Sequence, residues 1–323
     1  MSPSHAGDKG AAEPRLLTLF ITGFGRSGTT ILDSLLGQAA GAFSGGELHY
    51  IWDRSFGENR LCACGNPFAE CPVWRQIVAR AYPEDESDGL PDVERLTAIR
   101  DRFTPRHTLA QALRDRPLDT PAGDYVAALA GLYRAIRETT GCQAVIDSSK
   151  APGHGYLLSR TPSLDPRVVH MVRDPRAVAW SWQKQKVYDP SGEQPMLMSR
   201  HTPARSARLW TTWNLATELL WRRHGDRYLR LRYEDFARDP RAHLTRILEW
   251  IGLPPDAVSF AGDGTVTLQP THAVAGNPSR FSTGPVTVKP DEAWRDQMPA
   301  GQRRLVTLLT WPLMRRYGYP ITS

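Results

Sequence analysis

The chain has 323 residues and a formal net charge of +6, from 40 Lys and Arg against 34 Asp and Glu. This length suits one large α/β domain, with two smaller domains as the alternative, and it excludes a disulfide-stapled miniprotein. Because the charge excess is small and no block of Lys and Arg appears, we expect an anionic small molecule as partner and no nucleic acid.

The composition also bears on the compartment. No apolar run approaches the roughly 18 residues of a membrane-spanning helix, so we expect no membrane span. Residues 1–15 lack the apolar middle of a signal peptide, and we expect them to be a disordered N-terminal tail before one domain over residues 16–323. The four cysteines do not form a secreted disulfide framework, which favours a cytoplasmic protein.

The first strong element is an apolar run, Leu16 to Thr22, that ends in a glycine-rich stretch. Such a run predicts a buried parallel strand. Ile31, Leu32, Leu35 and Leu36 then recur at helical spacing, and Gly37 is a suitable C-terminal cap. The sequence therefore predicts a strand, a loop and a helix over residues 16–36.

Further strands are predicted at residues 144–146, 167–172 and 228–232, the last near a sheet edge. Each precedes a helical pattern, which is typical of βα units and a mainly parallel sheet flanked by helices. We expect a helical insertion over about 52–142, a long helix within 201–224, and an extended loop region over 252–290.

The loop after the first strand has a recognisable glycine spacing. Gly23 and Gly28 match the phosphate-binding pattern G-x-x-x-x-G-K-[ST], but Thr29 stands where the lysine belongs. Backbone N–H groups and a helix N-terminus still converge there on an anion. Arg26 adds a guanidinium suited to a tetrahedral oxyanion, whereas the missing lysine counts against γ-phosphoryl chemistry. A tight turn without a ligand is the alternative.

A second signal follows the strand at 167–172. Arg173 stands at the carboxyl end of that strand, where open α/β sheets bind ligands. If Pro175 lies in the first turn of the next helix, Ser181 lies about two turns inside it, and one ligand can reach both residues. Trp180 and Trp182 flank Ser181, and we interpret them as core residues.

Together these segments resemble the sulfotransferases that use 3′-phosphoadenosine 5′-phosphosulfate (PAPS). Arg26-Ser-Gly-Thr-Thr30 is similar to the element that binds the 5′-phosphosulfate, and Arg173 with Ser181 to the pair that binds the 3′-phosphate. Gly46-Glu47 and Asp147-Ser-Ser-Lys150 resemble segments of the branch that contains tyrosylprotein sulfotransferases and many bacterial enzymes. Residues 231–236 and 272–280 extend the resemblance from Leu16 to Tyr319.

The resemblance implies a three-layer fold like that of P-loop NTPases, and roles for particular residues. Glu47, Arg26 and Lys150 would be catalytic, with Glu47 as the general base and Lys150 as a second cation at the transferring group. The donor would be bound by Arg26, Ser27, Gly28, Thr29, Thr30, Arg173, Ser181, Tyr233 and Arg280.

Several of these roles have alternatives. Glu47 could be structural and orient Arg26, and Lys150 could be a solvated lysine after a strand. His49 and His154 are the rival bases, because the cytosolic branch of the family uses a histidine. Tyr233 would lie near the adenine or be a packed aromatic. His170, inside an apolar strand, is expected to be a hydrogen-bonded core residue.

Cys62, Cys64 and Cys71 form a compact group with a glycine turn. They could hold zinc if a fourth ligand came from elsewhere, but their spacing departs from common structural zinc patterns. A bridge from Cys71 to Cys62 or to Cys64, or buried thiols, is the preferred interpretation. We therefore expect no metal site and no metal requirement.

The function that the resemblance implies is transfer of the sulfuryl group from PAPS to a hydroxyl or amine of a small molecule, glycan or peptide, leaving adenosine 3′,5′-bisphosphate. Among acceptors, a secondary metabolite or a carbohydrate is expected. Two alternatives remain: a P-loop phosphotransferase (kinase) that uses a nucleoside triphosphate with magnesium, and a nucleotide-binding regulatory module without catalysis. The sequence does not indicate the oligomeric state.

Overall fold

The structure is a computed structural model. It describes residues 14–83, 89–114, 117–185, 187–189, 196–255, 258, 260–261 and 264–322. The expected tail over residues 1–15 therefore lies, apart from its last two residues, outside the described residues. Within the described part of the chain, no helix is both long enough and apolar enough to cross a membrane.

Five parallel strands form the central sheet, in the order β2-β3-β1-β4-β7. They are β1 (Leu16–Thr22), β2 (Ala42–Gly46), β3 (Ala144–Lys150), β4 (Leu164–Val172) and β7 (Tyr228–Arg232). At the carboxyl end of β1, Thr22 pairs with Lys150 on one side and with His170 on the other. The loops that leave β1, β3 and β4 therefore start side by side at one edge of the sheet.

The expected strands are confirmed, and β7 does lie at an edge. The other edge strand, β2, follows from no sequence signal, because its sequence is Ala-Phe-Ser-Gly-Gly. In the structure the strand continues through Ser44, and the chain leaves the extended conformation at Gly46, which has φ 74°.

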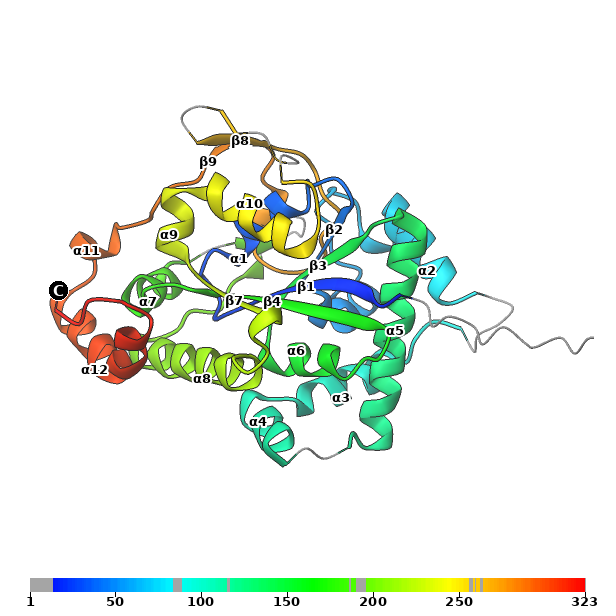
Figure 1. Cartoon of the computed structure of the whole chain (residues 1–323), viewed down its shortest axis with the longest axis horizontal. Coiled ribbons are helices and arrows are strands. Elements are labelled where there is room, and N and C mark those ends of the chain that lie inside the picture. Colours follow the sequence, from blue (N-terminus) through cyan, green and yellow to red (C-terminus); the bar gives the residue numbers. More distant parts are fainter. Residues whose placement is uncertain are drawn as a thin grey trace, which may run out of the picture.

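Helices cover both faces of the sheet, which confirms the three-layer α/β fold (Figure 1). One face carries α1 (Thr29–Leu36), α9 (Tyr233–Arg238) and α10 (Pro240–Ile251). The other carries α5 (Thr120–Thr140), α6 (Pro152–Ser159) and α8 (Pro203–Trp221). Beyond them, α7 (Pro175–Gln183) and α12 (Ala300–Arg316) pack against α8.

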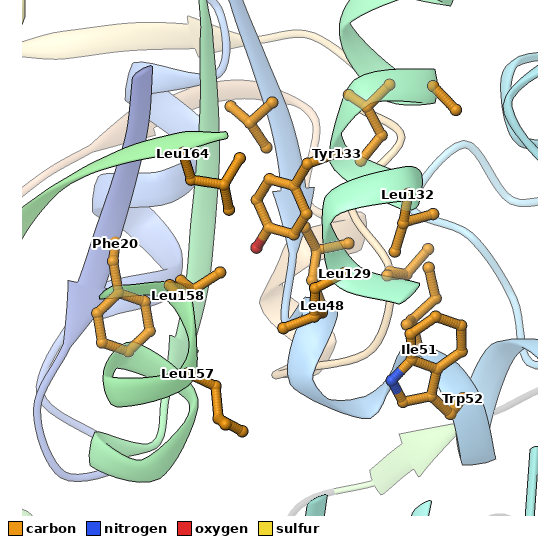
Figure 2. Close-up of a cluster of buried hydrophobic side chains, with 14 of the residues drawn as sticks. Phe20, Leu48, Ile51, Trp52, Leu129, Leu132, Tyr133, Leu157, Leu158 and Leu164 are labelled. Atoms are coloured by element: carbon orange, nitrogen blue, oxygen red, sulfur yellow. The ribbon is translucent and has the colours of Figure 1, made fainter. Parts of the chain in front are cut away.

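Alternation along the strands builds two cores. Leu19 and Ile21 of β1 face α1 and α10, while Phe20 faces α5 and α6. Because successive side chains of a strand point to opposite faces, a continuous apolar run fills both cores. Figure 2 shows the second core, where Phe20 packs near Leu157 and Leu158 of α6, and Tyr133 of α5 turns its hydroxyl inward.

The stretch expected to be a helical insertion does consist mainly of helices. It contains a π-helical turn (Ile51–Gly57), a 3₁₀ turn (Phe68–Glu70), α2 (Pro72–Ala81), α3 (Val93–Arg102), α4 (Pro105–Arg114) and α5. A further 3₁₀ turn, Leu48–Tyr50, precedes it. The helix α5 differs from the others because it packs directly on β1 and β3, so it belongs to a layer of the fold.

Short strands appear outside the central sheet. In the region expected to be an extended loop, β8 (Thr265–Leu268) pairs antiparallel with β9 (Gly284–Thr287). Between them lies a 3₁₀ turn, Pro278–Phe281. The strands β5 (Val187–Asp189) and β6 (Met196–Leu197) form a second pair, and α11 (Trp294–Gln297) precedes α12.

Candidate functional site

The loop between β1 and α1 is shaped by backbone conformations that most residues avoid. Gly28 has φ 89°, and a Cβ built there would lie 2.4 Å from the ring of Tyr233, so only glycine fits. Arg26 has φ 72°, a left-handed conformation that is uncommon for a residue with a side chain. Such strain, next to a cavity, is typical of functional loops.

The loop leaves donors free at the start of α1. Gly28 is the N-cap, and no side chain among the described residues caps the first turn of the helix. The N–H groups of that turn are therefore available to an anion. Ser27 Oγ and the Arg26 atoms Nε and Nη1 are buried and have no hydrogen-bond partner in the described part of the chain.

Arg26 makes only weak contacts, and its guanidinium forms no ion pair with the described residues. Its guanidinium carbon lies 5.0 Å from the centre of the Trp182 ring, and its Nη2 lies 3.1 Å from the weak acceptor Met198 Sδ. Burial lowers the pKa of Arg26, and the charge of Glu47 partly opposes this shift. A buried guanidinium with two free donors favours an anionic ligand, because an unpaired buried charge is costly.

Glu47 and Lys150 form a buried ion pair beside this loop. Glu47 directly follows β2 and Lys150 ends β3, so the pairing of these strands brings the two residues together. Lys150 Nζ donates to Glu47 Oε1 and, at 3.2 Å, to the carbonyl oxygen of Ser148. Gly276 makes room for the carboxylate, since a Cβ there would lie 2.9 Å from Glu47 Oε1.

The strand that carries Lys150 is fixed by a buried carboxylate. Asp147 accepts hydrogen bonds from the Ser149 backbone N–H at 2.9 Å and from the Tyr133 and Ser149 hydroxyls, and it lies 2.7 Å from His154 Nε2. Burial raises the pKa of Asp147, but His154 and these hydrogen bonds outweigh burial and hold the pKa below its usual value. Asp147 therefore fixes the end of the strand that carries Lys150, and it is not among the wall residues of the cavity described below.

The three possible bases differ in where they lie. Glu47 lines the cavity described below, whereas His49 and His154 are not among its wall residues. His154 is fully buried against Asp147. Burial, followed by the charges of His154, Arg100 and Arg54, holds the pKa of His49 well below its usual range. The geometry therefore favours Glu47 among the bases that the sequence indicates.

Arg173 marks a second cationic position, at the carboxyl end of β4. Its Nη1 donates to the carbonyl oxygen of Arg26 at 2.9 Å, and its Nη2 pairs with Asp291 Oδ2 at 3.0 Å. The guanidinium also lies over the ring of Tyr233, 4.6 Å from its centre. Burial raises the pKa of Asp291, but the hydrogen bond and charge of Arg173 outweigh it, so the pKa falls below its usual value.

The remaining residues that we expected to bind the donor differ in whether they line the cavity. Pro175 does start α7, so Ser181 lies two turns inside the helix and lines the same cavity as Arg173. Tyr233 packs on Gly28 and Arg173 outside the cavity wall. Arg280 is buried and donates at 3.2 Å to the carbonyl oxygens of Gly276 and Leu61, so the structure does not bring its guanidinium to the cavity. His170 is a core residue as expected, bonded to Tyr228 and Asn214.

One cavity joins these groups. Its volume is about 610 Å³ and it opens to solvent. Its wall includes eight of the eleven site residues that the sequence indicates, namely Arg26, Gly28, Thr29, Thr30, Glu47, Lys150, Arg173 and Ser181, whereas Ser27, Tyr233 and Arg280 are not on it. Residues from four separate segments of the chain therefore line one cavity that is large enough for a nucleotide.

The same cavity is also lined by residues that sequence reasoning missed. Tyr50 and Arg54 come from the turns after β2, with the Arg54 guanidinium 3.7 Å from the centre of the Tyr50 ring. Trp182, interpreted from the sequence as core, lies on the wall and donates from Nε1 to Gly25 O at 3.1 Å. Arg205 also lines it. No motif distinguishes these residues, because their place depends on how the helices pack over the sheet.

Comparisons with known proteins agree with this arrangement. The profile described as "Sulfotransferase family" matches residues 18–257. Carbohydrate sulfotransferase 3 of Homo sapiens is 29% identical over 180 residues, and the mouse protein of that name is 27% identical over 177 residues. Each match covers 51% of this chain and 36% of the relative, so the chain matches about a third of the length of these proteins.

A solved structure gives the same fold. The sulfotransferase domain of the olefin synthase of Synechococcus PCC 7002 superposes with a TM-score of 0.53 at 21% sequence identity. The superposition covers 97% of this chain and 98% of that domain.

Proposed function

The chain belongs to the sulfotransferase family, and we propose that it is a sulfotransferase enzyme whose donor is PAPS and whose acceptor is a hydroxyl of a small molecule, most simply a carbohydrate. One observation carries the proposal: the Glu47 and Lys150 pair borders the same cavity as the anion-binding loop of Arg26. The name of the curated relatives supports a carbohydrate acceptor.

The donor's two anionic groups have separate partners in this proposal. The 5′-phosphosulfate lies against Arg26 and the first turn of α1, where the helix N–H groups meet two guanidinium nitrogens, Nε and Nη1, that have no hydrogen-bond partner among the described residues. The 3′-phosphate lies at Arg173 and Ser181, on the far side of the Arg26 carbonyl. Tyr233 supports Arg173 by packing under its guanidinium.

The transfer then follows from these positions. The acceptor oxygen attacks sulfur while the bond from sulfur to the bridging phosphate oxygen breaks, and that bond's electron pair leaves with adenosine 3′,5′-bisphosphate. Glu47 takes the proton of the acceptor hydroxyl. Once Glu47 is neutral, Lys150 Nζ loses its ionic partner and is free to stabilise the charge that grows on the leaving oxygen. Arg26 holds the donor in line.

A ligand-stabilisation experiment tests the donor. Adenosine 3′,5′-bisphosphate should raise the unfolding temperature, since a ligand at 100 times its Kd stabilises by about 2.7 kcal/mol. ATP with magnesium should give a clearly smaller shift, because the loop lacks the lysine that contacts the β and γ phosphates. Stabilisation by ATP and magnesium alone would replace the proposal with the phosphotransferase alternative.

The acceptor needs its own assay. Radiolabelled PAPS is offered with neutral and acidic oligosaccharides, and with simple phenols as a comparison set. Label transfer to oligosaccharides supports the carbohydrate proposal. Transfer to phenols alone would leave the donor assignment intact and reject the carbohydrate.

A further inference from the structure

A cluster of four metal-binding side chains lies outside the cavity walls. Cys62, Cys64 and Cys71 meet His272, and their three sulfur atoms and one histidine nitrogen all lie within 4.8 Å of one another. None of the cysteines forms a disulfide, so of the two preferred alternatives, a bridge or buried thiols, the structure has the free thiols. His272 supplies the fourth ligand whose source the sequence left open.

The separations fit one tetrahedral ion. Two sulfur ligands about 2.3 Å from zinc lie about 3.8 Å apart, and a sulfur and a nitrogen ligand about 3.6 Å apart. In the structure, the sulfurs of Cys64 and Cys71 are 3.7 Å apart. His272 Nδ1 lies 3.3 Å from Cys71 Sγ and 4.0 Å from Cys62 Sγ. A sulfur–sulfur distance of 3.7 Å is too long for a disulfide bond.

The surroundings hold these ligands in place. The Cys62 backbone N–H donates to Asn66 O at 2.8 Å, and Gly65 N–H returns to Cys62 O at 2.9 Å, which closes a tight turn. Cys71 is the N-cap of α2, so its sulfur faces the positive end of a helix. Trp74 Nε1 donates to His272 O at 2.7 Å and fixes that backbone. Cys62 and Cys71 are fully buried.

We propose that Cys62, Cys64, Cys71 and His272 bind one structural zinc ion. Three thiolates and one imidazole form the closed tetrahedral set that zinc prefers, with no position left for a reacting water. On binding, each thiol loses its proton to solvent and the histidine coordinates as the neutral ring. This proposal is independent of the donor and acceptor assigned above.

The site clamps two distant segments beside the catalytic pair. The loop that carries the cysteines donates from Ala63 N–H to Ala273 O at 3.0 Å, next to His272. The following residue, Val274, exchanges backbone hydrogen bonds with Gly45 at 3.0 Å and Glu47 at 2.9 Å. Gly276, two residues further on, leaves room for the Glu47 carboxylate, since a Cβ there would lie 2.9 Å from Glu47 Oε1. Zinc would therefore act as a positioning element for Glu47, through backbone and without touching substrate.

The full chain tests this directly. After growth with added zinc, the purified protein should contain one zinc ion per chain. Replacement by cobalt should give the visible absorption of tetrahedral thiolate-bound Co²⁺, which a metal held on surface carboxylates does not show. Metal-free protein with four reactive thiols would overturn the proposal. So would a mass lower by two hydrogens, the mark of a disulfide.

Variants locate the ion. Cys64→Ser and His272→Ala should lose most of the bound zinc, and Cys142→Ser is the matched control because Cys142 is a buried cysteine outside the cluster. If a cluster variant fails to fold, the wild-type cobalt spectrum still decides the coordination. Equal zinc content in His272→Ala and Cys142→Ser would remove His272 from the site and contradict the four-ligand assignment.

Discussion

The two cationic ends of the cavity stand at similar places in the fold, but their arginines differ in how their hydrogen-bond donors are paired. Arg26 and Arg173 both stand in loops that leave neighbouring parallel strands, at the same edge of the sheet. Among the described residues, Arg26 has no hydrogen-bond partner for its buried Nε and Nη1, whereas Arg173 lacks one only for Nε and is paired through Nη1 and Nη2 with the Arg26 carbonyl and Asp291. A ligand therefore meets more free donors at the first end, and at the second end it competes with a carboxylate.

The largest expected effect is a loss of turnover when Glu47, the proposed base at the Arg26 end, can no longer take the proton of the acceptor hydroxyl. Glu47→Gln removes the proposed base while keeping its size, so turnover should fall about 10²- to 10⁴-fold, with the affinity for adenosine 3′,5′-bisphosphate retained. Single-turnover kinetics and isothermal titration measure the two quantities. Asp291→Asn makes the same acid-to-amide change at the other end, and should keep turnover. Equal losses in the two variants would contradict the contrast between the ends.

The next effect tests the free donors of Arg26. Arg26→Ala should lower kcat about 10²- to 10³-fold, as loss of an oxyanion-stabilising donor does. Its unfolding temperature should stay close to that of the wild type, because in the free enzyme the Arg26 Nε and Nη1 make no hydrogen bond to the described residues. Arg26→Lys keeps a charge without the fork and serves as the control. Full activity in Arg26→Ala would remove this residue from the reaction.

A smaller effect is expected at the paired end. Arg173→Ala should weaken binding of adenosine 3′,5′-bisphosphate by about 1.5–3 kcal/mol, the usual size of a lost hydrogen bond to a charged group. Binding of adenosine 5′-monophosphate, which lacks the 3′-phosphate, should change much less, and titration with both nucleotides measures the difference. If both weaken equally, Arg173 supports the loop and does not read the 3′-phosphate.

The smallest expected effect is on nucleotide affinity when Asp291, the carboxylate paired with Arg173, is replaced. Asp291→Asn removes the charge that would compete with a 3′-phosphate for Arg173, and the Asp291 side chain is 47% exposed, so we expect binding to tighten only by about 0.2–1 kcal/mol. The measurement is the ratio of Kd values for adenosine 3′,5′-bisphosphate. Weaker binding in the variant would mean that Asp291 orients Arg173 for the ligand.

The sequence predicted the half of the site that local patterns encode. The loop after β1 and the start of α7 each combine a continuous apolar strand with a turn and a helix start, and these signals need no knowledge of distant contacts. In contrast, the sequence of β2 shows no strand pattern, because most of its residues have low strand propensity. It forms a strand because of its buried position beside β3.

Long-range contacts account for what was missed. His272 lies about 200 residues beyond Cys71, and hydrogen bonds that its segment makes with the end of β2, Ala63 and Trp74 bring it to the cysteines. Likewise, Arg280 lies near the site in the fold, but its side chain turns to the carbonyls of Leu61 and Gly276. Side-chain direction in an irregular segment follows from packing, which spacing along the chain does not encode.

The hydrogen bond from Arg173 to the carbonyl of Arg26 has a consequence for nucleotide discrimination. That carbonyl belongs to Arg26, whose backbone has φ 72°. The Arg173 guanidinium therefore helps to hold the backbone conformation that sets the direction of the Arg26 side chain. If a 3′-phosphate draws Arg173 away from Asp291, we expect this hydrogen bond to shift and the Arg26 guanidinium to move with it. A donor without the 3′-phosphate should therefore lose transfer rate as well as affinity.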